Sequence, residues 1–77
     1  MYKGLKLKVL EAGKVIGIII VKEVKDDKNF TAEDEGAPDS DVEFRFLEET
    51  NSWHLVYEGL GNEKCVKEEL PYTLCPC

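Results

Sequence analysis

The sequence contains no long apolar run, no glycine-rich phosphate loop and only one histidine. Its most apolar stretch, VIGIIIV at residues 15–21, has seven residues, whereas an α-helix needs roughly 20 to cross a bilayer. With a single histidine, the sequence offers few ways to place a general base beside a nucleophile, and it contains no recognisable catalytic motif. These absences favour a cytoplasmic protein that is not an enzyme, requires no cofactor and does not bind a membrane.

Cysteine is scarce and confined to the end of the chain. All three cysteines lie in the last thirteen residues, so no disulfide framework holds the body of the domain, and a reducing compartment is expected. We expect free thiols and no metal, because the CPC ending lacks the paired C-x-x-C spacing of common zinc sites. Two alternatives remain: a disulfide between Cys65 and a tail cysteine, or a metal- or redox-responsive site built from His54, Cys65, Cys75 and Cys77.

The dominant period of the sequence is two, which is typical of half-buried strands. In LKLKV, Leu5, Leu7 and Val9 alternate with lysines, and Phe44 and Phe46 later alternate with charged residues. Short polar turns separate these segments, and such connections are too short for parallel crossovers. The sequence therefore predicts an antiparallel meander of five strands, at residues 5–9, 14–24, 30–34, 42–49 and 53–59.

The rest of the architecture follows from the isoleucine-rich strand and the C-terminal pattern. Residues 15–21 are apolar at both parities, which predicts a central strand covered on both faces. A curled sheet or small barrel, a packed helix or a homodimer through Val15–Val21 could provide that cover, and we favour the curled sheet or small barrel. Residues 62–70 predict one short helix and residues 71–77 an extended tail. The expected class is mainly β (α+β), with residues 1–77 forming a single small domain.

Positive and negative charges are segregated along the chain. Residues 1–28 carry seven lysines against four carboxylates, whereas residues 29–63 carry ten carboxylates against Arg45 alone. The whole chain has a net charge of −6. Because nucleic acids are bound through lysine and arginine, this balance disfavours direct binding to nucleic acid.

The acidic segment EDEGAPDSDVE at residues 33–43 predicts a loop, and three interpretations of it stay open. It could be a solvated loop, a surface for a basic protein partner, or a calcium site at Asp39, Asp41 and Glu43, which lacks the glycine and distal glutamate of helix-loop-helix sites. We expect a small acidic binding protein that acts as an inhibitory or regulatory module, in the extreme case by imitating DNA phosphates. Tyr57 and Trp53 are candidate apolar anchors. The expected partner-binding residues are Glu33, Asp34, Glu35, Asp39, Asp41, Glu43, Glu48 and Glu49.

Overall fold

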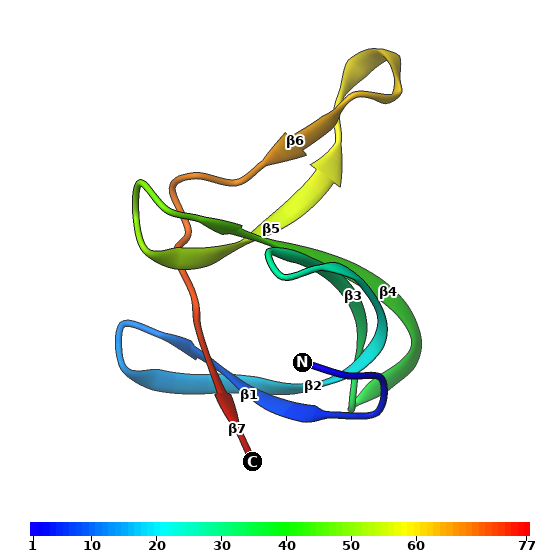
Figure 1. Ribbon diagram of the computed structural model, residues 1–77, viewed down its shortest axis with the longest axis vertical. Helices are drawn as coiled ribbons and strands as arrows, with labels where there is room; N and C mark the ends of the chain where they lie inside the picture. The colour runs from blue at the N-terminus through cyan, green and yellow to red at the C-terminus, as the bar shows by residue number, and fades with distance from the viewer.

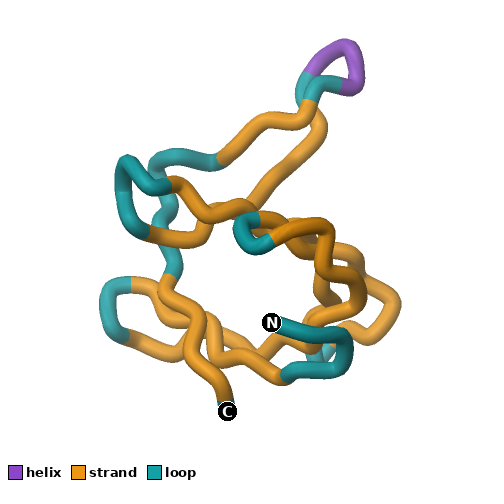
Figure 2. The backbone as a smooth tube through the Cα atoms, in the orientation of Figure 1, coloured by secondary structure: helices purple, strands orange, loops and turns teal.

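The computed structural model describes residues 1–77 as one antiparallel sheet of seven strands with a single turn of 3-10 helix (Figure 1, Figure 2). The mainly β, antiparallel prediction is confirmed, but the predicted count of five strands is wrong. The helical turn is η1 (Leu60–Asn62), and no helix is long and apolar enough to cross a membrane. The strands are β1 (Lys6–Glu11), β2 (Lys14–Asp26), β3 (Asn29–Asp34), β4 (Ala37–Leu47), β5 (Ser52–Glu58), β6 (Lys64–Val66) and β7 (Thr73–Pro76).

The strands have the order β6-β5-β4-β3-β2-β1-β7 in the sheet. The first six form the predicted meander, and the chain then returns so that β7 pairs with β1 at the opposite end. No ladder joins β6 to β7, so the sheet is open and uncurled, and the predicted curled sheet or small barrel is not formed. On its return the chain makes one isolated bridge, in which Trp53 and Tyr72 exchange two backbone hydrogen bonds of 3.0 and 2.8 Å.

The core is assembled from alternating residues of the first four strands and from Tyr72. Aromatic contacts connect it to β5: the ring of Phe30 stacks on Phe44 at 5.4 Å between centroids and meets Trp53 edge-on at 5.1 Å. Such pairs add stability beyond the area that they bury. The buried apolar residues are Leu7, Val9, Ile19, Val21, Phe30, Ala32, Phe44 and Tyr72.

Strand β2 is central, as predicted, but only one of its faces is fully covered. Ile19 is buried with 4% of its surface exposed, whereas Ile18 and Ile20 on the other face are half-buried. The prediction of cover on both faces is therefore wrong. No second layer lies over this face; Ile18 and Ile20 have Lys8 and Lys6 as cross-strand neighbours, and lysine stems cover apolar surface only in part. A homodimer through Val15–Val21 stays a prediction.

The acidic segment is not the predicted loop. β3 runs to Asp34, the chain turns at Glu35 and Gly36, and β4 begins at Ala37. The turn is fixed locally, because the Asp34 carboxylate accepts a hydrogen bond of 2.8 Å from the Gly36 N–H, and the Ser40 hydroxyl accepts one of 3.0 Å from the Asp34 N–H. Charges and a proline are compatible with a strand where one side has no partner, and β4 has such a side.

The predicted C-terminal helix at residues 62–70 is absent. Residues 64–66 form β6, which pairs with Val56–Glu58 of β5. Asn62 has a φ of 66°, so it lies in a left-handed turn and does not cap a helix. Only Leu70 of this segment packs against the core, and the apolar pattern there is too sparse to hold a helix on a sheet. The predicted tail is extended, with β7 forming the last strand.

Candidate functional site

Strands β4 and β5 diverge, and a groove of about 550 Å³ lies where they part. β5 pairs with β4 only along Glu43–Leu47, so Ala37–Val42 has no strand on that side. Val56–Glu58 of β5 pairs with β6 along the opposite edge of β5, and the β5–β6 hairpin extends away from the rest of the molecule (Figure 1). The groove is therefore bounded by an open strand edge and by a hairpin. Its lining residues are Glu23, Lys25, Thr31, Asp41, Val42, Glu43, Val56, Tyr57, Glu58 and Lys64.

The groove is acidic and has one large apolar side chain. Four carboxylates and two lysines line it, and Asp39 lies two residues before Asp41 on the same exposed side of β4. Tyr57 is 45% exposed, although its alternate neighbours Trp53 and Leu55 pack against the core. A groove with this lining offers negative charge at fixed positions beside an accessible aromatic ring, which suits a basic segment of a protein partner.

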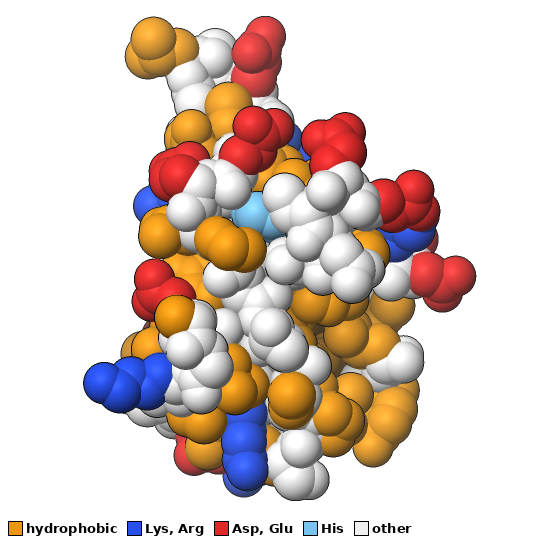
Figure 3. All heavy atoms as spheres, turned by 90° about the vertical axis from the view of Figure 1, so that its left-hand side faces the viewer, with side chains coloured by type: hydrophobic (Ala, Val, Ile, Leu, Met, Phe, Trp, Pro, Cys, Tyr) orange, Lys and Arg blue, Asp and Glu red, His pale blue; other side chains and the backbone are white.

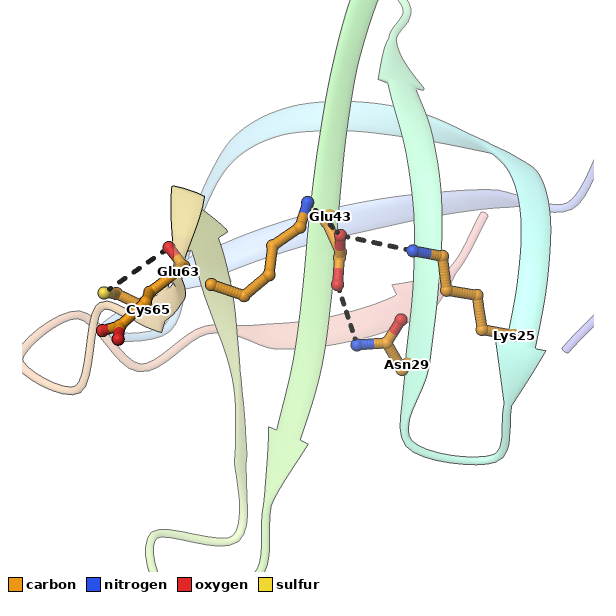
Figure 4. A network of polar contacts seen from close by, with 6 residues as sticks. Lys25, Asn29, Glu43, Glu63 and Cys65 are labelled. Atoms are coloured by element: carbon orange, nitrogen blue, oxygen red, sulfur yellow. Dashed lines mark hydrogen bonds and ion pairs between the residues drawn. The ribbon is translucent and has the colours of Figure 1, made fainter. Parts of the chain in front are cut away.

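Glu43 anchors the wall of the groove through a polar network (Figure 4). One carboxylate oxygen accepts a hydrogen bond of 3.0 Å from the Asn29 amide, and the other lies 3.5 Å from the Lys25 ammonium and 3.4 Å from that of Lys64. The network joins β2, β3, β4 and β6. Desolvation alone would raise the pKa of Glu43, but the hydrogen bonds from Asn29 and Lys64 and the attraction of Lys25 outweigh it and lower the pKa.

This network predicts an acid-dependent loss of stability. Because its pKa is lower in the folded state, Glu43 stabilises the fold above its ordinary pKa of 4.5, and the contribution is lost as the pH falls through the folded value. Glu43→Gln should therefore lower the free energy of unfolding by about 1 to 2 kcal/mol at pH 7, with the difference vanishing in acid. Urea unfolding between pH 7 and 2 measures this. Glu49→Gln, at an exposed residue without an ion pair, is the control, and equal effects of both substitutions would contradict the assignment.

The other predicted partner-binding residues lie at two separate places. Glu33, Asp34 and Glu35 lie at the end of β3 and in the following turn, whereas Glu48 and Glu49 lie in the turn at the far end of β4. Several of these carboxylates are already paired with lysines: Glu35 with Lys6 at 2.9 Å, Asp41 with Lys22 at 2.6 Å, and Glu48 with Lys28. The charges that are segregated along the sequence thus meet in the fold. Of the predicted residues, only Asp39, Asp41 and Glu43 adjoin the groove. A protein that imitates DNA phosphates presents a continuous row of unpaired carboxylates, and these ion pairs interrupt such a row.

The histidine and the cysteines do not come together. His54 is completely buried, with its ring nitrogens 2.7 Å from the Thr50 hydroxyl and 2.8 Å from the Lys67 carbonyl oxygen. Cys65 is in β6 and Cys75 in β7, at opposite ends of the sheet, and all three thiols are free. The structure therefore does not bring His54, Cys65, Cys75 and Cys77 together in one site, and it contains no disulfide between Cys65 and the tail. No cluster of three or more potential metal ligands exists, including at Asp39, Asp41 and Glu43.

Comparison with known protein families, curated proteins and solved structures finds no match to this chain. The function must therefore be argued from the groove. The sequence indicated Tyr57 and the β4 carboxylates, but it did not indicate Glu23 and Lys25 of β2, Glu58 of β5 or Lys64 of β6. The length of β2 was the one indication in the sequence that β2 residues reach this groove. The apolar alternation of this strand continues to Val24, whereas β1 pairs with it only as far as Ile20.

Proposed function

We propose that this protein is a small acidic binding protein that holds a basic segment of a protein partner in the groove between β4 and the β5–β6 hairpin. It acts as an interaction or inhibitory module and catalyses no reaction. The open edge of β4 beside a groove with twice as many carboxylates as lysines carries this proposal.

The edge is selective by charge. Pro38 removes one backbone donor, and Asp39 and Asp41 project from the exposed part of β4, so a second acidic strand is repelled from it. A segment rich in lysine or arginine instead gains attraction along the same edge. Charges at such a surface mainly accelerate association and select the partner, while a buried aromatic residue supplies affinity. Tyr57 is in the right place for that contact.

The location of binding can be tested with a synthetic peptide of alternating lysine and valine. We expect its titration into ¹⁵N-labelled protein to shift amide resonances mainly at 39–43 and 56–58, because these residues adjoin the groove. Shifts of equal size around Glu11, Glu68 and Glu69, which do not line the groove, would show diffuse attraction to negative charge and contradict the proposal.

A further inference from the structure

The tip of the β5–β6 hairpin presents an isolated apolar side chain to solvent. Leu60, in the turn η1 between the two strands, is 98% exposed. Figure 2 shows this turn as the point of the chain farthest from the sheet, at the end of the projecting hairpin. An exposed leucine is common on protein surfaces, but one at the end of a projection can enter a concave site on another molecule without any rearrangement of the sheet.

The shape of the tip is held by its backbone. The Gly59 N–H donates a hydrogen bond of 2.7 Å to the Glu63 carbonyl oxygen, which closes the turn. A Cβ atom at Gly59 would lie 2.8 Å from the Cys65 sulfur, so a larger residue at this position would displace the Cys65 side chain. Gly61 and Asn62 both have positive φ values, of 76° and 66°. Leu60 is thus presented in a defined conformation, which reduces the entropy lost when it binds.

The charges around the tip are negative, because the nearby lysines contact residues away from the tip. The Lys64 ammonium lies 3.4 Å from the Glu43 carboxylate, and that of Lys67 lies 5.7 Å from the centre of the Tyr57 ring. Glu58 and Glu63 remain exposed on either side of Leu60. Figure 3 shows apolar and acidic side chains together at this end of the molecule.

We propose that Leu60 is a second apolar anchor of the interface, beside Tyr57, and enters an apolar pocket with a basic rim on the partner protein. This inference rests on the proposed function, since the hairpin that carries Leu60 also forms one wall of the groove. A protein is favoured over a lipid surface because a chain of net charge −6 is repelled by anionic headgroups. A symmetric pairing of two such tips is disfavoured because it would place Glu58 and Glu63 against like charges.

The test combines a cross-linker with matched substitutions. A photoreactive amino acid is placed at position 60 or, as a control, at position 15, because Val15 is also exposed, at 53%, but lies outside the groove and the hairpin. A protein cross-linked in lysate through position 60 is identified and purified. Its affinity is then measured for the wild-type protein, Leu60→Ser and Val15→Ser. We expect a basic protein whose affinity falls about 10-fold or more with Leu60→Ser and less than about 2-fold with Val15→Ser.

Several results would overturn the inference. These are cross-linking that is no stronger through position 60 than through position 15, equal effects of the two serine substitutions, or an acidic partner. Leucine-dependent sedimentation with vesicles of phosphatidylglycerol and phosphatidylcholine would assign Leu60 to a membrane, and a dimer lost in Leu60→Ser would assign it to self-association. If neutralising the groove carboxylates weakens binding and Leu60→Ser does not, the proposed function stands and the anchoring role of Leu60 is wrong. If neither change matters, both are wrong.

Discussion

Replacing Ile19 with aspartate should lower the free energy of unfolding by about 4 kcal/mol or more, because it places an unpaired charge in the core. The same substitution at Ile18 should cost only about 1 to 2 kcal/mol. Ile18 lies on the half-buried face of β2, opposite Lys8 of β1, where a carboxylate can stay hydrated and pair with that lysine.

Chemical unfolding of the two variants measures this difference directly. Circular dichroism at 25 °C should show Ile19→Asp largely unfolded and Ile18→Asp folded with a lower midpoint. Equal and severe destabilisation would mean that both faces of β2 are covered, for example by a second copy of the chain. In that case the loss should depend on protein concentration.

Phe30→Ala should be nearly as damaging, with an expected cost of about 3 to 5 kcal/mol. The ring is completely buried and contacts both Phe44 and Trp53, so its removal leaves a cavity among the strands that form the core. Phe46→Ala is the matched control, because Phe46 also contacts Trp53, at 5.4 Å, but is only half-buried.

Tryptophan fluorescence during urea unfolding reports on both substitutions, since Trp53 is the only tryptophan. Phe30→Ala should shift the unfolding midpoint at least about twice as far as Phe46→Ala. A larger shift for Phe46→Ala would place the centre of the core nearer the turn between β4 and β5 than the structure does.

Most strands of the sheet were predictable, because their apolar and polar residues alternate with the two-residue period of an extended chain. Leu7 and Val9, or Phe44 and Phe46, can share one face of an extended chain and no face of a helix. The two faces of β2 could not be distinguished in this way, because Ile18 and Ile19 are identical in chemistry. Their difference depends on what lies above the sheet, and the order of residues along one strand does not contain that information.

Local composition was misleading where tertiary pairing decides the structure. Asp39 and Asp41 have low strand propensity, yet they lie within β4, between Ala37 and Val42, which both pair with β3. Residues 62–70 resemble a weak helix, but β5 offers an unpaired edge and Lys64–Val66 pairs with it. Leu60 lies between two glycines, Gly59 and Gly61, which predicts a turn with an apolar side chain outside any strand. This was the only feature of the sequence that indicated the exposed tip.

The candidate site was predictable only in part for the same reason. Asp39 and Asp41 adjoin the groove as charged residues of the predicted interaction surface. Glu43, equally acidic in sequence, is largely enclosed by Asn29, Lys25 and Lys64, which are 14 to 21 residues away along the chain. These distant lysines determine which carboxylates remain unpaired. The sequence alone therefore suggested more exposed negative charge than the structure has.

The measurement that most directly tests the binding proposal is the association rate with the cross-linked, purified partner as a function of salt. Two variants should be compared, each of which changes the net charge from −6 to −2. The groove variant carries Glu23→Gln, Asp39→Asn, Asp41→Asn and Glu58→Gln. The remote variant carries Glu11→Gln, Asp27→Asn, Glu68→Gln and Glu69→Gln.

The groove proposal predicts that wild-type association slows as salt rises from about 0.1 to 1 M, where the Debye length falls from about 10 to about 3 Å. It also predicts that the groove variant associates about 10-fold more slowly than the wild type at low salt, while the remote variant stays within about 2-fold. Equal rates for the two variants, or a wild-type rate that is insensitive to salt, would contradict the assignment of binding to the groove between β4 and the β5–β6 hairpin.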